Sequence, residues 1–168
     1  MRARSLVAAA IFAVGLPISA GQAFDDPKAL LNAIYEPMTH GQKPTDLMPF
    51  YSNALKLKFI DRARSEPGDG AAATQPGQGS EVQQVEQHFD PFVSSANVLL
   101  FDLNIADPVV MGDRAVATVS YHNFDHPALL SIALVKENDG WKVDDVASMG
   151  PDQHWLLSWL LTNDPWAN

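Results

Sequence analysis

The side chains of this chain that could take part in acid–base chemistry are a few carboxylates, histidines and tyrosines. An isomerase- or lyase-like enzyme needs an ionisable base in a cavity and a hydrogen-bond donor for the oxyanion that develops. The candidate bases are Asp102, Asp144, Asp145 and His122, and the candidate donors are Tyr35, Tyr51 and Tyr121. Successive residues of a strand face opposite sides, so Asp145 is the inward carboxylate if Trp141 faces the core. In the other interpretation, Asp145 lies at the end of the sheet and accepts hydrogen bonds from a loop or a helix start.

Two histidines, His122 and His126, have the H-x-x-x-H spacing that would place both imidazoles on one face of a helix, as a metal site requires. Asp125 could supply a third ligand. The intervening Asn-Phe-Asp and the following Pro127 indicate a turn rather than a helix, so we expect solvated turn residues here and no metal.

Other kinds of reactive site lack their sequence signatures. The chain has no cysteine, which excludes a disulfide, a thiolate nucleophile, Cys-ligated zinc and a lipidated cysteine. It has no Gly-x-Ser-x-Gly nucleophile elbow. The glycines between residues 68 and 79 are irregularly spaced, lack the Lys-Ser/Thr ending of a phosphate-binding loop and follow no predicted strand. We therefore predict no catalytic residue, no metal and no cofactor, and retain Tyr35, Tyr51, Tyr121 and Asp145 as candidates for ligand binding.

The first 23 residues have the pattern of an export signal. Two arginines lie among the first four residues, residues 6–18 are apolar apart from one glycine and one proline, and small residues follow up to Ala23. Signal-peptide cleavage is expected after Ala23 or after Ala20; the alternative is a buried N-terminal helix. The apolar stretch is shorter than the ~20 residues that span a bilayer. We expect a periplasmic or secreted protein with no stable membrane anchor, whose residues 24–168 form a single domain.

The charge of the chain limits its partners. The full chain carries 20 acidic and 11 basic residues, a net charge of −9, and loss of the two leader arginines would make it −11. Such a surface repels phosphate backbones and anionic headgroups. We therefore expect no nucleic acid partner, and either a basic partner or a charge that serves solubility alone.

The N-terminal half has helical periodicity. Asp26 is suited to the N-cap, with Pro27 at the first helical position, and Gly41 is suited to the left-handed position after the helix. The apolar stripe of this helix is Leu30, Leu31, Ile34, Tyr35 and Met38. A short segment over 46–51, capped by Thr45, should follow, and Ser52 should cap a helix to Arg64 whose inward residues are Leu55, Phe59 and Ile60.

Residues 65–80 contain no large apolar side chain, so they cannot bury enough surface to offset the entropy of ordering. They are expected to form a flexible surface loop, either a disordered insertion or a lid over a cavity. A short helix is expected over 81–89.

From Val98 onward the hydrophobic period changes to two, as in a half-buried sheet. Strands are expected from Phe101 to Ile105 and over 115–121, 129–136 and 141–147, with turns at Met111-Gly112-Asp113, 123–127 and Asn138-Asp139-Gly140. Short connections favour an antiparallel meander with one face covered by the helices. A C-terminal helix over 152–161 should place Trp155, Leu156, Trp159 and Leu160 on one face.

This α+β arrangement, with N-terminal helices packed on a curved four-stranded antiparallel meander and a C-terminal helix, is that of a nuclear-transport-factor-2-like or cystatin-like cone. Particular segments sharpen the comparison: Leu47-Met48-Pro49-Phe50-Tyr51-Ser52, Phe89-Asp90-Pro91-Phe92 and Gly140-Trp141-Lys142-Val143-Asp144-Asp145-Val146. Over residues 26–161 the chain resembles domain-of-unknown-function family 3828, a family of exported bacterial proteins. The resemblance implies the cone fold and the compartment, and no chemistry.

Three functions remain open at this point. The main hypothesis is a non-catalytic periplasmic binding or accessory protein that takes a small ligand or a protein partner. The alternatives are an immunity or inhibitor protein against a basic exported toxin, and an isomerase- or lyase-like enzyme that uses a cavity carboxylate. Ligand identity, oligomeric state and ordering of loop 65–80 on binding have no signature in the sequence.

Overall fold

The structure is a computed structural model of the chain, and it describes residues 23–65, 90–93, 95, 97–151 and 154–163. The predicted leader up to residue 22, nearly all of loop 65–80 and the predicted helix 81–89 lie outside the described residues.

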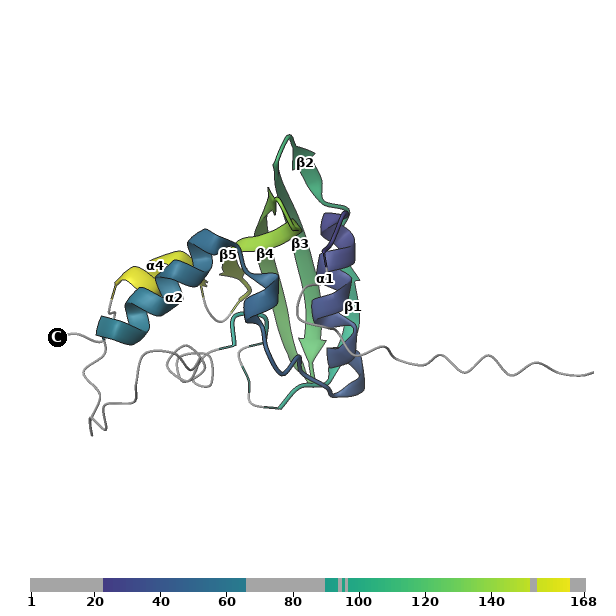
Figure 1. Cartoon of the computed structure of the whole chain (residues 1–168). Coiled ribbons are helices and arrows are strands. Elements are labelled where there is room, and N and C mark those ends of the chain that lie inside the picture. Colours follow the sequence, from purple (N-terminus) through teal and green to yellow (C-terminus); the bar gives the residue numbers. More distant parts are fainter. Residues whose placement is uncertain (1–22, 66–89, 94, 96, 152–153, 164–168) are drawn as a thin grey trace, which may run out of the picture.

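The described chain is α+β, with a few short helices beside a mostly antiparallel six-stranded sheet (Figure 1). The helices are α1 (Pro27–Tyr35), η1 (Pro37–His40), η2 (Met48–Phe50), α2 (Asn53–Ser65) and α4 (Leu157–Thr162). The strands are β1 (Leu100–Ile105), β2 (Val109–Met111), β3 (Arg114–Asn123), β4 (His126–Glu137), β5 (Gly140–Met149) and β6 (His154–Leu156).

The strand order is β1-β3-β4-β5-β6, and β2 pairs with β3 outside this path. The four predicted strands are present. The sheet has six strands instead of the expected four, because the short strands β2 and β6 are added to it. Both glycine turns are confirmed: Gly112 and Gly140 have φ of 65° and 105°, values that glycine adopts without steric cost. The turn between β3 and β4 is shorter than expected, since only Phe124 and Asp125 separate the strands.

A bulge in β1 changes which residues of that strand face the core. Asp102 has a positive φ of 52°, and the register with β3 shifts between Phe101 and Asn104. Leu100 is consequently buried and Phe101 is half exposed, although alternation groups Phe101 with Leu103 and Ile105. A bulge adds one residue to one strand and so reverses the faces that follow it.

Helix α1 begins where the sequence predicts. The Asp26 carboxylate accepts a hydrogen bond from the Lys28 backbone N–H at 2.7 Å, which satisfies one of the free donors of the first turn. The α-helix ends at Tyr35, and Pro37 begins the 3-10 turn η1. Gly41 then adopts the expected left-handed conformation, with φ of 74°.

Helix α2 is anchored to the edge of β5 by the residue predicted to cap it. Ser52 Oγ accepts from the Leu55 N–H at 3.0 Å, and the Ser52 N–H donates to the Val143 carbonyl at 2.8 Å. Leu55 and Phe59 face inward. The Phe59 ring stacks on Tyr51 at a centroid distance of 5.2 Å, so the predicted cap also sets the helix on the core.

The predicted C-terminal helix over 152–161 is wrong in extent and in its buried face. Residues 154–156 form β6, which pairs with the end of β5, and α4 begins only at Leu157. Leu157 and Leu161 are the buried residues of α4, and Trp159 is half exposed. Pairing with the open edge of β5 satisfies backbone groups that a helix would otherwise satisfy internally, and this tertiary contact overrides the local pattern.

One hydrophobic core joins the helices to the inner face of the sheet, the face on which Ala115, Ala117 and Val119 are buried. It takes Leu30, Leu31, Ile34 and Tyr35 from α1 and alternating residues of β3 and β4. Within the described part of the chain, no helix has the length and apolar character needed to cross a membrane.

Candidate functional site

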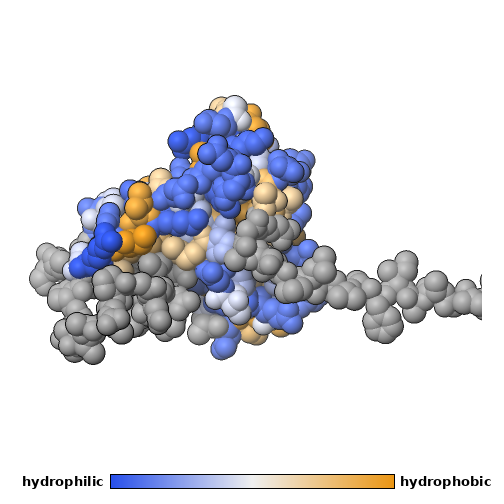
Figure 2. Space-filling view, in the orientation of Figure 1, coloured by the Kyte–Doolittle hydropathy of each residue, from blue (hydrophilic) through white to orange (hydrophobic). Residues whose placement is uncertain are grey.

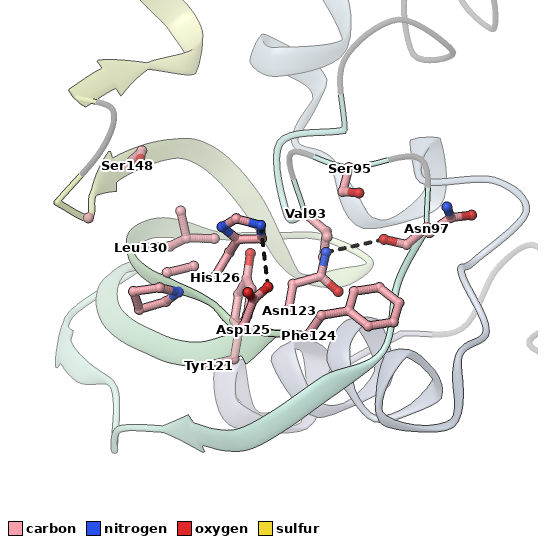
Figure 3. A pocket seen from close by; sticks show the side chains of 13 residues that line it. Val93, Ser95, Asn97, Tyr121, Asn123, Phe124, Asp125, His126, Leu130 and Ser148 are labelled. Carbon is pink, nitrogen blue, oxygen red and sulfur yellow. Dashed lines mark hydrogen bonds and ion pairs between the residues drawn. The ribbon is translucent and has the colours of Figure 1, made fainter.

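A cavity of about 560 Å³ opens at the end of the sheet where β3 turns into β4. Its walls come from three places: the hairpin residues of β3 and β4, the segment at Val93 to Asn97 that precedes β1, and the end of β5 near Ser148 (Figure 3). Tyr121 and Leu130 line it from the inner face of the sheet, since both belong to the buried set in the alternation along β3 and β4. The cavity therefore continues the buried face of the sheet outward until it opens to solvent.

The lining combines apolar and uncharged polar groups. Val93, Pro127, Ala128 and Leu130 contribute apolar surface, and Asn123 contributes an amide. At the mouth, His126 and Asp125 lie side by side with 3.4 Å between Nε2 and a carboxylate oxygen, both strongly exposed. Among the described residues that line the cavity, the side chains that can carry a charge therefore lie at its mouth.

The wall before β1 is fastened by Asp90 and Lys43. One oxygen of Asp90 accepts from the N–H groups of Phe92 and Val93 at 2.9 and 3.2 Å, an arrangement typical of Asp at the start of a turn. The other oxygen pairs with Lys43 Nζ at 2.9 Å. The same ammonium donates to the Ser95 carbonyl at 2.5 Å, so one lysine holds two points of the wall.

Two residues of β3 fasten the wall from the other side. The Tyr121 hydroxyl donates to the Phe92 carbonyl at 2.5 Å in a buried position. Asn123 is buried, and its amide donates to the Asn97 carbonyl at 3.1 Å while its oxygen accepts from the Leu99 N–H at 3.0 Å. The cavity is bounded on this side by a segment that is hydrogen-bonded to the sheet.

The three tyrosines proposed from the sequence do come together, around Phe92. The Phe92 ring lies 5.8 Å from Tyr35 in an edge-to-face arrangement and 6.1 Å from Tyr51, and Tyr35 lies 6.0 Å from Tyr121. Such pairs add a specific aromatic term to the burial of apolar area. Only Tyr121 of the three lines the cavity; Tyr35 and Tyr51 are fully buried behind it.

Burial also raises the pKa of two tyrosines of this cluster. It raises the pKa of Tyr35 well above its ordinary value, and the neighbouring Tyr121, Asp90 and Tyr51 raise it further. The pKa of Tyr121 is raised by burial and then by Asp90. Both hydroxyls, which are neutral at physiological pH as in any tyrosine, therefore stay protonated to higher pH than an exposed tyrosine does. Tyr121 uses its proton to hold Phe92, whereas the buried Tyr35 hydroxyl has no hydrogen-bond partner among the described residues.

Asp145 lies away from the cavity, at the start of α4. Its carboxylate accepts from the Ser158 N–H at 3.0 Å and from the Val146 N–H at 2.9 Å. A bulge explains why alternation from Trp141 does not lead to an inward Asp145: Val143 pairs with Leu134, but Asp145 pairs with the next residue, Ala133. The position matches the other interpretation of Asp145 given above, a carboxylate that accepts hydrogen bonds from a helix start.

The remaining candidate acids and bases also lie elsewhere. Asp144 accepts from Ser52 Oγ at 2.7 Å and from the Arg114 guanidinium at 2.9 Å, so it ties the start of α2 to β3. Asp102 is strongly exposed on the β1 bulge and lies 3.4 Å from His122 Nδ1. Over the described ranges, no three or more metal-binding side chains gather in one place. None of these residues lines the cavity.

Sequence reasoning missed Lys43 and Asn123, which do the most to position the wall. The pair Asp90-Pro91 is typical of a turn, so the sequence could have predicted that the Asp90 carboxylate accepts from the N–H groups that follow it. Lys43 lies 47 positions before Asp90 and Asn123 lies 24 positions after Leu99. No local pattern links either pair.

No protein-family model and no curated protein matches the chain. Among solved structures, the chain is similar to a chain in the crystal structure of the type VI native effector–immunity complex Tae3–Tai3 from Ralstonia pickettii. The identity is 14%, the match covers 77% of this chain and 100% of the other, and the TM-score is 0.43. Values this low do not establish a shared fold or function.

Proposed function

We propose that this protein is an exported, non-catalytic binding protein that takes a small ligand into the cavity at the end of the sheet. With this we propose a cone of the nuclear-transport-factor-2-like kind, membership of domain-of-unknown-function family 3828, and a mature domain of residues 24–168 in the periplasm or outside the cell. The observation that carries the function is the 560 Å³ cavity bounded by a fastened wall. Ligand sites are typically of this size and mixed apolar and polar character.

The lining indicates the chemistry of the ligand. Val93, Pro127, Ala128 and Leu130 suit an apolar group, and the amide of Asn123 suits a hydrogen-bonding one. An ion buried among these groups would lack a counter-charge and would lose hydration. The ligand is therefore uncharged where it enters the cavity, with an apolar body and a few polar atoms.

The enzymatic alternative lacks support from the same residues. It depends on a carboxylate in the cavity within hydrogen-bond reach of a tyrosine. Asp145 instead accepts from the start of α4, and Asp102 is strongly exposed beside His122. Neither is placed to remove a proton from a molecule beside Tyr121.

The test uses a neutral, polarity-sensitive dye, N-phenyl-1-naphthylamine, titrated into the mature protein. Dye fluorescence is expected to rise saturably on binding. Ala128→Trp fills part of the cavity and is expected to weaken binding at least tenfold. The matched control is Ala54→Trp, at an exposed position of α2 that does not line the cavity. Equal binding by both variants, with far-UV circular dichroism unchanged, would refute the cavity as the site.

A second candidate function is inhibition of a basic exported protein, and the exposed carboxylates favour it. Asp107, Asp125 and Asp102 expose more than four-fifths of their side chains, and the chain has nine more acidic than basic residues. Charge complementarity of this kind steers association and weakens with salt. A pull-down with the mature protein from an envelope extract should then capture a cationic protein at low salt and release it at high salt. A partner that remains bound at high salt would contradict this candidate.

A further inference from the structure

The mouth of the cavity carries a fixed charge of one sign. Among the described residues that line the cavity, Asp125 is the only one that is charged when histidine is counted as neutral, and no lysine or arginine belongs to the set. Asp125 exposes 89% of its side chain, and its neighbour across 3.4 Å is the His126 imidazole (Figure 3). A ligand group that stays at the mouth therefore meets a carboxylate and no basic side chain of the described lining.

The lysine of the adjacent wall does not offset this charge. Lys43 Nζ pairs with the Asp90 carboxylate at 2.9 Å and donates to the Ser95 carbonyl. The two side chains of this ion pair are 27% and 14% exposed, so the charge of Lys43 is balanced inside the wall. The electrostatic potential at the mouth is then dominated by Asp125 and by the net charge of the chain, which is −9.

The residue before Asp125 presents an aromatic ring to the same mouth. Phe124 lines the cavity, exposes half of its surface and has a positive φ of 56°. Two-residue hairpin turns with positive φ favour Asn and Gly, because a bulky side chain is strained there. The Phe124 N–H donates to the Leu99 carbonyl at 3.1 Å, which holds the strained turn against the residue before β1. Strained residues gather at ligand sites, and the face of a Phe ring attracts cations.

We infer that the ligand of this cavity is a small molecule with an apolar body and a cationic end, such as an amine. This inference rests on the proposed binding function and adds the charge of the ligand to it. The apolar body lies among Val93, Ala128 and Leu130, where an ion would lose its hydration. The cationic end stays in water at the mouth, beside the Asp125 carboxylate and the Phe124 ring. An anionic end would be repelled by the same carboxylate and by the net negative charge.

The net charge alone would attract any cation, so a control must separate the mouth of the cavity from the rest of the surface. In the view of Figure 2, hydrophilic residues cover broad areas, and hydrophobic ones gather over α2 and α4 and near the tip of the β2–β3 hairpin. An amine with an apolar body could adsorb to those areas as well. Asp113 is exposed in the β2–β3 turn, at the opposite end of β3 from Asp125. Replacing either aspartate with asparagine changes the net charge by the same amount.

The test displaces N-phenyl-1-naphthylamine from the mature protein at neutral pH with three compounds that share a naphthalene ring. They are 1-naphthylmethylamine, which is a cation, 1-naphthylmethanol, which is neutral, and 1-naphthylacetate, which is an anion. The amine is expected to bind about fivefold more tightly than the alcohol, an effect typical of an ion pair at an exposed position, and the acetate should bind most weakly. Ala128→Trp should weaken binding of the amine as it weakens binding of the dye, because both occupy the cavity.

The variants locate the origin of this preference. Asp125→Asn is expected to reduce the preference for the amine over the alcohol to about twofold or less, and Asp113→Asn should preserve it. Phe124→Asn removes the ring at a φ that asparagine tolerates and should also reduce the preference.

Two results overturn the inference and leave the binding proposal intact. One is equal binding of the amine and the alcohol by the wild-type protein, and the other is the same preference in the Asp125→Asn and Asp113→Asn proteins. Failure of the binding proposal is recognised separately, because dye fluorescence would then not rise before any competitor is added, and both proposals would be refuted together.

Discussion

Tyr35 and Tyr121 are both buried and their rings are adjacent, but they differ in whether the hydroxyl makes a hydrogen bond. The Tyr121 hydroxyl donates to the Phe92 carbonyl at 2.5 Å, and the Tyr35 hydroxyl has no hydrogen-bond partner among the described residues. The substitution to Phe removes the same atom from each side chain and leaves both rings in place. Tyr35→Phe is thus a matched control for Tyr121→Phe.

The expected changes follow from what each hydroxyl does. Tyr121→Phe removes a hydrogen bond with a net value of about 1 kcal/mol and leaves the buried Phe92 carbonyl unsatisfied, at about 1 kcal/mol or more. The free energy of unfolding should fall by about 2 kcal/mol. Tyr35→Phe removes a hydroxyl that was buried without compensation, so the free energy of unfolding should stay the same or rise by about 1 kcal/mol.

The assay is urea unfolding of the mature protein followed by circular dichroism, with the free energy taken by linear extrapolation. The double variant should give the sum of the two single changes to within about 0.5 kcal/mol if the hydroxyls act independently. A Tyr35→Phe protein destabilised as much as Tyr121→Phe would show that the Tyr35 hydroxyl is satisfied. A neutral Tyr121→Phe would show that the cavity wall is not held by this bond.

Two further predictions concern pH and backbone conformation. Burial raises the pKa of Tyr35 and Tyr121 above the ordinary value of about 10, so above that pH the folded chain holds more protons than the unfolded chain. The contribution of these two tyrosines to the free energy of unfolding should be fully present below about pH 10 and should be lost as pH rises above it. Tyrosinate absorbance should then appear together with the loss of circular dichroism. Ionisation of both groups before unfolding would contradict this prediction. Gly140→Ala places a Cβ 2.6 Å from the Phe24 nitrogen at a φ of +105° and should lower the free energy of unfolding by about 3 kcal/mol. Gly112→Ala, at φ +65° with open space around it, should lower the free energy of unfolding by about 1 kcal/mol. Equal losses in the two variants would show that the contact with Phe24 does not destabilise Gly140→Ala.

Much of the local structure could be predicted from the sequence, because its causes lie within a few residues. Asp26 and Ser52 cap the helices that follow them, since a cap needs only a side-chain oxygen near the first free N–H groups. The strands of the meander follow from a period of two in hydrophobicity, and Gly112 and Gly140 mark two of its turns by their tolerance of positive φ.

The candidate site could be predicted only in part. The tyrosines were recognised as a set, but nothing in their spacing shows that Phe92 gathers them or that Tyr121 alone reaches the cavity. The side of the sheet to which Asp145 belongs depends on a bulge in β5. A bulge is a property of two paired strands, and the spacing within one strand does not show it.

The sequence by itself determined the types of most elements, the starts of α1 and α2, the glycine turns and the strongly acidic charge. Tertiary structure alone decided that residues 154–156 pair with β5 instead of forming a helix, that Lys43 holds Asp90 and the wall beside it, and that Tyr121 reaches the cavity whereas Tyr35 does not. The physical reason is the range of the forces involved. Caps and periodicity act within one or two turns of chain, whereas strand pairing, burial and ion pairs join residues that only the folded chain brings together.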